Sequence, residues 1–157
     1  MTRKRPLDRL LIAFVKTRLG RYLFTGPFSA LDKRLMPLIG GRSLAVGHPV
    51  CLLHTVGAKT GKPRRTALLF TPSGDDIVVA ASRGGAPTAP AWYFNVRANP
   101  RVDVDIRGKR HAMVAREAEG REREQLWALL NDHFDGYEQY QERIDRRIPV
   151  IVLSPVG

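Results

Sequence analysis

The feature that most constrains the fold is a change in hydrophobic pattern just after Pro49. Before it, apolar residues recur at helical spacing, whereas residues 50–56 form a nearly continuous apolar run with β-branched members. Such a run is typical of a buried strand. The chain has 157 residues, a usual length for one domain. We therefore predict a helical extension over residues 1–47 and a single β-rich domain over residues 48–157.

The domain is predicted to contain six strands. After residues 50–56, five segments combine apolar or alternating patterns with turn-forming flanks, at residues 66–71, 77–81, 101–107, 110–118 and 148–153. Residues 72–75 read as a turn, and Gly108-Lys109 is predicted as a type II′ hairpin turn because its glycine comes first. Helices are predicted at residues 90–98, 122–134 and 137–144. This order favours an α+β barrel of mostly antiparallel strands with flanking helices.

Positive charge is concentrated in the N-terminal extension. The formal net charge is +11, and residues 1–50 carry ten basic and two acidic side chains. Apolar residues between Leu7 and Phe14 follow helical spacing. This segment fits either a basic amphipathic helix on an anionic membrane surface or a solubilising arm that packs on its own domain or on a second subunit. Nucleic acid is not expected as a partner, because Phe14 and Tyr22 are the only aromatic residues within residues 1–22.

The sequence shows neither a membrane-spanning segment nor an export signal. The apolar run at residues 10–15 is far shorter than the roughly 20 residues that cross a bilayer, and no small-residue cleavage site follows it. We therefore expect a cytoplasmic protein, either free or held at the inner face of the cell membrane through the amphipathic segment.

Metal sites and self-sufficient catalytic groups are not predicted. Cys51 is the single cysteine, and the four histidines lack the spacing of metal ligands. No nucleophile elbow and no paired carboxylates stand out. An enzyme with this sequence would therefore depend on the chemistry of a cofactor.

A basic, glycine-containing segment follows the first strand. Gly57 to Arg65 contains two glycines and four cations, Lys59, Lys62, Arg64 and Arg65. It is not a nucleotide-hydrolase P-loop, because three residues rather than four separate the glycines and a strand rather than a helix follows. The segment is either a site where the backbone approaches an anion or a solvated hairpin turn.

A second loop follows the strand at residues 77–81. Its sequence Ala80-Ala81-Ser82-Arg83-Gly84-Gly85 has small residues that would admit a flat ring or a phosphate, and the helix that follows would direct N–H groups at an anion. A flexible loop is the simpler interpretation. Tyr137 and Tyr140 lie three residues apart, so on a helix they share a face, where they either pack or contact a ligand.

These segments together resemble the deazaflavin-dependent nitroreductase family. The resemblance is carried by residues 52–64, 79–85, 90–95 and 98–100 and by Arg147-Ile148-Pro149-Val150-Ile151, in the family's order, and it extends from about Cys51 to Leu153. It implies a split β-barrel that binds coenzyme F420, an 8-hydroxy-5-deazaflavin with a phosphate and an acidic oligoglutamate tail. In reduced form, this coenzyme delivers hydride to quinones, nitro compounds or other electrophiles.

The resemblance also implies a set of site residues. The phosphate and tail would lie beside Ala58, Lys59, Thr60, Arg64 and Arg65, and the coenzyme would continue along Thr66, Ala67, Leu68 and Leu69. The ring and phosphate would be held by Ala80, Ala81, Ser82, Arg83, Ala91, Trp92, Tyr93, Phe94 and Asn95. Tyr137 would close over the ring and Tyr140 would contact the acceptor. Together with Ser82, these two tyrosines are the catalytic candidates.

One departure bears on the acceptor. Leu69 and Phe134 stand where the nitroimidazole-reducing branch of the family carries tyrosines. The wall of the acceptor site is therefore less polar, which favours a flat apolar acceptor such as a quinone. Two alternatives stay open at this point: an FMN-binding reductase on the same barrel, and a non-catalytic basic module that binds membrane or nucleic acid.

Overall fold

The computed structural model describes residues 48–157, so the predicted extension over residues 1–47 lies outside the described residues. Residues 48–157 contain seven strands: β1 (Val50–Val56), β2 (Pro63–Leu69), β3 (Thr71–Ser73), β4 (Asp76–Ala80), β5 (Arg101–Ile106), β6 (Lys109–Glu117) and β7 (Val150–Pro155). The helices of this described part are α4 (Ala91–Ala98), α5 (Gly120–His133) and α6 (Gly136–Gln141), with a short 3-10 turn, η1 (Arg83–Gly85), before α4.

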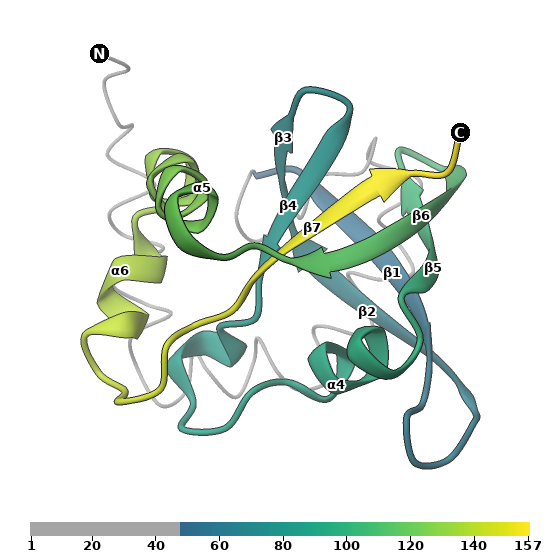
Figure 1. Cartoon of the computed structure of the whole chain (residues 1–157), viewed down its shortest axis with the longest axis horizontal. Coiled ribbons are helices and arrows are strands. Elements are labelled where there is room, and N and C mark those ends of the chain that lie inside the picture. Colours follow the sequence, from purple (N-terminus) through teal and green to yellow (C-terminus); the bar gives the residue numbers. More distant parts are fainter. Residues whose placement is uncertain (1–47) are drawn as a thin grey trace.

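The seven strands form one antiparallel sheet with the order β2-β1-β5-β6-β7-β4-β3. The sheet curls on itself, so β2, which lies at one edge, contacts β4 near the other edge. The result is a half-barrel, as the curved strands in Figure 1 show. Right-handed twist accumulates across many strands and favours this closure.

Two apolar clusters lie on opposite faces of the curled sheet. The inner cluster fills the half-barrel and includes Cys51, Leu53, Val79, Val104 and Leu153, all fully buried. The outer cluster lies between the β4–β7 side of the sheet and helices α5 and α6, and includes Val78, Leu130, Ile148 and Val150. Side chains alternate between the faces of a strand, so neighbours such as Val78 and Val79 belong to different clusters.

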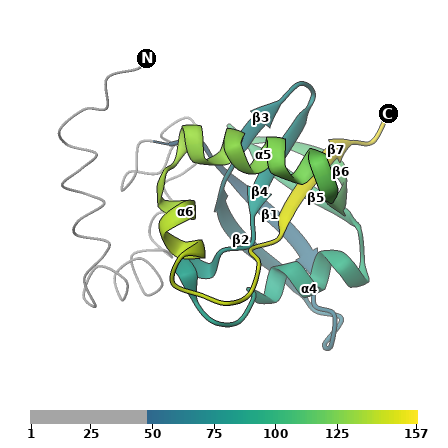
Figure 2. The ribbon, with the colours of Figure 1, turned by 60° about the vertical axis from the view of Figure 1, so that its left-hand side comes forward.

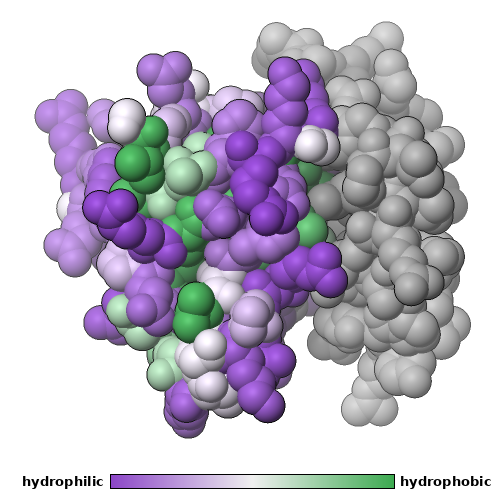
Figure 3. Space-filling view, turned by 90° about the vertical axis from the view of Figure 1, so that its right-hand side faces the viewer, coloured by the Kyte–Doolittle hydropathy of each residue, from purple (hydrophilic) through white to green (hydrophobic). Residues whose placement is uncertain are grey.

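The helices lie at two places around the half-barrel. Figures 1 and 2 show α5 and α6 side by side against the sheet, while α4 crosses the end of the half-barrel near β1 and β2. Within residues 48–157, no helix is long and apolar enough to cross a membrane. The face seen in Figure 3 is mostly hydrophilic around a narrow hydrophobic strip.

The predicted elements agree with the structure except at edges and turns. The first strand is confirmed at Val50–Val56. The turn predicted at residues 72–75 is present at residues 74–75, but its first two residues belong to the additional strand β3 (Thr71–Ser73), which includes Pro72. This strand is an edge strand, where a residue without an N–H group costs no ladder hydrogen bond on the open side.

The hairpin between β5 and β6 turns one residue earlier than predicted. Ile106 pairs with Lys109, so Arg107 and Gly108 form the two-residue turn. Their φ angles are +50° and +77°. Positive φ at both positions belongs to a type I′ turn, not to the predicted type II′ turn.

Candidate functional site

The basic loop, residues 57–62, connects β1 to β2 and closes through its own backbone. The N–H of Gly57 donates to the carbonyl of Lys62 at 2.8 Å, and the N–H of Gly61 donates to the carbonyl of Gly57 at 2.8 Å. Gly61 has a φ of +64°, which favours glycine. The four cations Lys59, Lys62, Arg64 and Arg65 are exposed, and none forms an ion pair with another residue of the described part of the chain.

Asn95 fastens the basic loop to α4. Its side-chain oxygen accepts a hydrogen bond from the N–H of Ala58 at 2.9 Å, and its side-chain nitrogen donates to Thr55 Oγ1 at 3.1 Å. Asn95 and Thr55 are both buried. The amide therefore positions the start of the loop, and both of its polar ends are used by the protein itself.

A second loop, residues 81–86, follows β4 and is named here the strand-end loop. Its residues Arg83, Gly84 and Gly85 all have positive φ, from +49° to +78°. The preceding residue, Ser82, is right-handed and buried. A right-handed residue followed by a left-handed one turns successive N–H groups toward one concave surface, a geometry that binds anions. No acceptor within residues 48–157 receives the N–H of Ser82, Arg83 or Gly84.

Arg146 holds the strand-end loop from the other side of the chain. Its Nε donates to the carbonyl of Ala86 at 3.1 Å, its Nη1 to that of Ala81 at 3.2 Å, and its Nη2 to that of Ser82 at 2.9 Å. The sequence does not point to Arg146. It is the first of two consecutive arginines and carries no spacing signal, and its partners lie 60 to 65 positions away.

The two tyrosines of α6 share a face, as predicted, but differ in burial. Tyr137 is buried in the outer cluster, where its ring lies 5.1 Å from that of Phe134, and burial raises its pKa far above the usual range. Tyr140 is half-buried, and burial also raises its pKa. Tyr140 adjoins the strand-end loop: a Cβ on Gly85 would lie 3.2 Å from the Cβ of Tyr140.

Helix α4 presents only part of its predicted binding set to the surface. Trp92 and Tyr93 are buried in the inner cluster, and the Tyr93 hydroxyl donates to Glu117 at 2.8 Å. Burial, and then Glu117, raise the pKa of Tyr93. Ala91 and Phe94 are exposed. The rings of Trp92 and Tyr93 therefore pack in the core.

The remaining residues predicted to border the coenzyme lie in β2 and at the end of β4. Thr66, Ala67, Leu68 and Leu69 are half-buried along β2, an edge strand. Ala80 and Ala81 are buried at the end of β4. In Figures 1 and 2, the basic loop and η1 lie at the same end of the half-barrel, with α4 between them. The fold thus brings both anion-suited loops to one end of the sheet.

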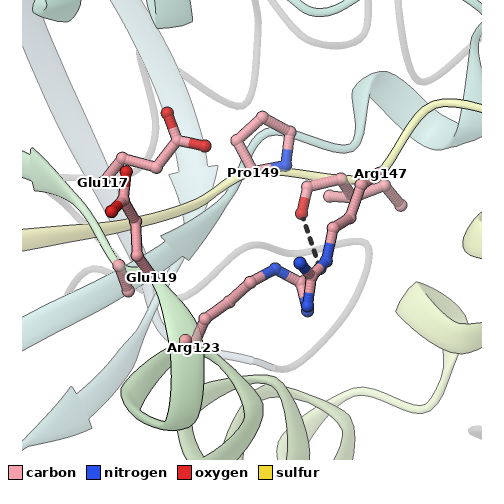
Figure 4. Close-up of a pocket in the computed structure, with 8 residues that line it drawn as sticks. Glu117, Glu119, Arg123, Arg147 and Pro149 are labelled. Atoms are coloured by element: carbon pink, nitrogen blue, oxygen red, sulfur yellow. Dashed lines mark hydrogen bonds between the residues drawn. The ribbon is translucent and has the colours of Figure 1, made fainter.

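A separate pocket of about 340 Å³ lies at the start of α5. Figure 4 shows Arg123 closing it from below, with Glu117 and Glu119 on one side and Arg147 on the other. Arg123 Nη2 donates to the carbonyl of Ile148 at 3.0 Å, and its guanidinium lies 5.2 Å from the ring centre of Trp127. None of the predicted site residues lines this pocket.

His54 hydrogen-bonds within the sheet, and Cys51 is buried in the inner cluster. His54 bonds to Asp105 at 2.7 Å, and Asp105 also accepts from Arg110, which is the main reason that the pKa of Asp105 lies below its usual range. Burial raises the pKa of Cys51 to about 12. Among residues 48–157, no group of three or more potential ligands could hold a metal ion.

The curled antiparallel sheet with flanking helices defines a split-barrel protein, and its two loops suit an anionic coenzyme. A family profile described as F420H(2)-dependent quinone reductase matches residues 32–155. The chain is 38% identical over 123 residues to an F420H(2)-dependent quinone reductase of Mycobacterium tuberculosis, which covers 73% of this chain and 83% of that protein. The chain belongs to the F420H(2)-dependent quinone reductase family.

Solved structures support the same assignment. A structure described as an F420-H2 dependent reductase is 42% identical, has a TM-score of 0.63, and covers 68% of this chain and 94% of that chain. Another, described as a domain-swapped dimer, is 36% identical with a TM-score of 0.64 and covers 82% of this chain and all of that one. The predicted α+β split barrel is therefore confirmed.

Proposed function

We propose that the two loops at the end of the half-barrel hold coenzyme F420, and that a quinone-type molecule is the acceptor. Membership of the family makes the protein an oxidoreductase that depends on reduced F420. The observation that carries the assignment of the site is that both loops lie at one end of the half-barrel, on either side of α4. Four exposed cations without acidic partners in the described chain lie at the same end as a loop with free N–H groups.

The residues present fit such a coenzyme. A phosphate and an acidic tail together carry several negative charges, which Lys59, Arg64 and Arg65 would neutralise in the basic loop and the start of β2. Ser82 and Arg83 would offer backbone N–H groups to the phosphate, and the Arg83 side chain adds a cation nearby. FMN also has a phosphate but has no acidic tail, so it would leave most of the cations of the basic loop and the start of β2 unused.

The ring would lie beside small side chains. Ala80 and Ala81 end β4 beside the strand-end loop, while Thr66 to Leu69 run along the edge strand β2. Both segments would border the deazaflavin, and Ala91 and Phe94 would approach it from α4. Trp92, Tyr93 and Asn95 would act on it through the shape of the wall they support, because their side chains are buried in the protein.

When bound, reduced F420 supplies the hydride. The protein residues would orient the acceptor, exclude water and provide or accept a proton. Tyr140 is the better placed of the two tyrosines for contact with an acceptor, since it is half-buried and adjoins Gly85. Its hydroxyl would donate a hydrogen bond as negative charge develops on the acceptor. Tyr137 is buried, and we assign it to the support of that surface.

The acceptor wall is aromatic and apolar. Phe134 lies against both tyrosines, with ring centres 5.1 Å from Tyr137 and 6.3 Å from Tyr140. Leu69 adds an apolar side chain from β2. A flat quinone would stack on such a surface, and the lack of a hydroxyl at these two positions argues against nitroimidazoles as preferred acceptors.

A paired titration tests the proposed coenzyme. F420 and FMN are titrated separately into the purified protein, and each is followed by its own fluorescence. We expect F420 to saturate and FMN to bind far more weakly, because FMN has no oligoglutamate tail for the basic loop. Tighter binding of FMN would overturn the assignment and favour a flavin reductase on the same barrel.

Contact with an anionic membrane through residues 1–24 stays a prediction from the sequence. Residues 1–50 carry ten basic and two acidic side chains, which suits an anionic lipid surface. Pelleting with vesicles that contain anionic lipid should decrease when residues 1–24 are deleted, while F420 binding is kept. Equal pelleting of both forms would contradict the prediction.

A further inference from the structure

We propose that Arg146 is a positioning residue for the coenzyme, and that it acts by fixing the shape of the strand-end loop. The inference rests on the proposed function, because the loop is assigned there to the ring and phosphate. Arg146 contacts neither group in this assignment. It acts through the backbone of residues 81–86.

The Arg146 side chain makes three hydrogen bonds to the strand-end loop. All three kinds of guanidinium nitrogen of Arg146 donate to carbonyls of a single loop, at 2.9 to 3.2 Å. Donation to Ala81 and Ser82 fixes the entry of the loop, and donation to Ala86 fixes its exit. A planar guanidinium can span these points at once, whereas an ammonium group cannot.

The hydrogen bonds from Arg146 use carbonyl groups of the loop and leave three of its N–H groups available. Because Arg146 takes the carbonyls of Ala81 and Ser82, these oxygens do not face an incoming anion. The N–H groups of Ser82, Arg83 and Gly84 have no acceptor within residues 48–157. These three N–H groups are therefore left for a ligand, while the carbonyls of Ala81 and Ser82 are used by the protein.

The backbone of the strand-end loop adopts an unfavourable conformation, which interactions from outside the loop must stabilise. Arg83 is a non-glycine residue with a φ of +49°, a conformation that costs about 1 kcal/mol or more. It precedes two glycines that are also left-handed, and the local hydrogen bonds of the turn come from the N–H groups of Gly85 and Ala86 and from the Arg83 side chain, which donates to Thr88. The three hydrogen bonds from Arg146 supply that support from outside the loop.

The backbone around Arg146 is itself fixed by hydrogen bonds to Gln141 of α6. Gln141, at the end of α6, donates to the carbonyl of Arg146 at 2.9 Å and accepts from the N–H of Ile148 at 2.8 Å. Tyr140, its neighbour in α6, packs on Gly85. The helix that carries the acceptor-side tyrosine and the strand-end loop are thus joined into one unit.

The positive charge of Arg146 also favours an anionic ligand at the strand-end loop. Burial, and then the nearby Arg83, lower the pKa of Arg146 from the ordinary arginine value. Two guanidinium groups near one another, without a carboxylate partner in the described chain, make this end of the half-barrel attractive to an anion.

The test compares Arg146→Lys and Arg146→Ala with Arg147→Ala. The last variant removes the same charge one position away, where the side chain lines the separate pocket rather than the loop. The first readout is the dissociation constant for F420. We expect Arg147→Ala to bind nearly as the wild type, and Arg146→Lys to bind about tenfold more weakly, as expected for lost hydrogen bonds from a charged group.

The second readout does not require the coenzyme. The N–H groups of Gly85 and Ala86 donate to Ser82 and Arg83 within the loop, at 3.0 and 3.2 Å. Their hydrogen exchange in Arg146→Lys should be faster than in the wild type and in Arg147→Ala. Exchange in β5 should stay unchanged, which separates an altered loop from an unstable fold.

The possible results separate this proposal from the proposed function. A wild type that does not bind F420 would overturn the proposed function. Folded Arg146→Lys with wild-type affinity for F420 and wild-type exchange of Gly85 and Ala86 would overturn the role of Arg146. If Arg146→Ala does not fold, Arg146→Lys decides the matter, because a lysine keeps the charge and one donor group.

A double-mutant cycle gives a final check. If Arg146 acts through the loop that presents Arg83, then Arg146→Lys should cost less F420 affinity in an Arg83→Ala background than in the wild type. Fully additive losses would show that Arg146 acts independently of the loop, and would contradict the proposal.

Discussion

The two loops of the candidate site are held by opposite means. The basic loop carries exposed cations and is tied to the rest of the domain by one buried amide, Asn95. The strand-end loop carries few charges, is partly buried, and is clamped by three hydrogen bonds from Arg146. We infer that the basic loop attracts the coenzyme by charge and that the strand-end loop recognises it by shape. Changes in salt and changes in packing should therefore affect them differently.

The largest expected effect contrasts the glycines of the two loops. Gly85 and Gly61 both have positive φ, but a Cβ on Gly85 would lie 3.2 Å from Tyr140, whereas a Cβ on Gly61 meets nothing within 4 Å. We expect Gly85→Ala to lower the free energy of unfolding by about 2–4 kcal/mol, from strain plus overpacking. Gly61→Ala should cost about 1–2 kcal/mol, from strain alone. Urea unfolding of both variants measures the difference, and equal losses would show that the Tyr140 contact can relax.

The second prediction concerns the cations of the basic loop and of the start of β2. We expect Lys59→Ala and Arg64→Ala each to weaken F420 binding by about 1.5–3 kcal/mol, the range for a hydrogen bond to a charged group. The loss should shrink at high salt, because these side chains are exposed. Arg121→Ala, at an exposed position on α5, serves as the control for net charge. Unchanged affinity in both loop variants would identify the loop as a solvated turn.

The third prediction concerns the single buried tie of the basic loop. Asn95→Ala leaves the N–H of Ala58 and the hydroxyl of Thr55 without their partner, so we expect a loss of about 1–3 kcal/mol in the free energy of unfolding. Hydrogen exchange of the Ala58 amide should become faster. Asn95→Asp keeps an acceptor for this amide and should retain more of its protection. Slow exchange in both variants would mean that the loop holds its shape without Asn95.

The smallest expected effect separates the two tyrosines of α6. Tyr140→Phe should lower turnover with a quinone by about tenfold or less, since solvent can replace the hydroxyl as a proton source, while F420 affinity stays nearly intact. Tyr137→Phe should leave turnover unchanged, because its hydroxyl is buried. Steady-state kinetics with a thermal melt of each variant measure both outcomes. A silent Tyr140→Phe with a destabilising Tyr140→Ala would assign both rings to packing.

Elements with a strong local signal were predictable from the sequence. The strand β1 was placed at residues 50–56 because its apolar run is continuous, and α4 because proline flanks it on both sides. The short strand β3 was missed, since three residues with a proline resemble a turn. The predicted turn, Gly108-Lys109, is one residue later than the observed turn, Arg107-Gly108, because the register between β5 and β6 depends on the pairing of the strands.

The candidate site divides in the same way. The charge of the basic loop is a property of consecutive residues, so the sequence alone indicated an anionic ligand, and the order of several motifs indicated the family. The clamp by Arg146 joins residues 60 to 65 positions apart. Arg146 and Arg147 are consecutive and carry the same charge, yet Arg146 holds the strand-end loop, whereas Arg147 lines a separate pocket.

The amino-acid sequence alone predicts the β-rich class of the fold, the chemistry of the basic loop and membership of a deazaflavin-dependent family. These properties depend on hydrophobic period, charge and motif order, which are local or additive along the chain. Only the tertiary structure decided which side of the sheet each residue faces, and so placed Trp92 in the core and Tyr140 beside Gly85. The physical reason is that hydrogen bonds and packing between distant segments form only when the sheet has curled.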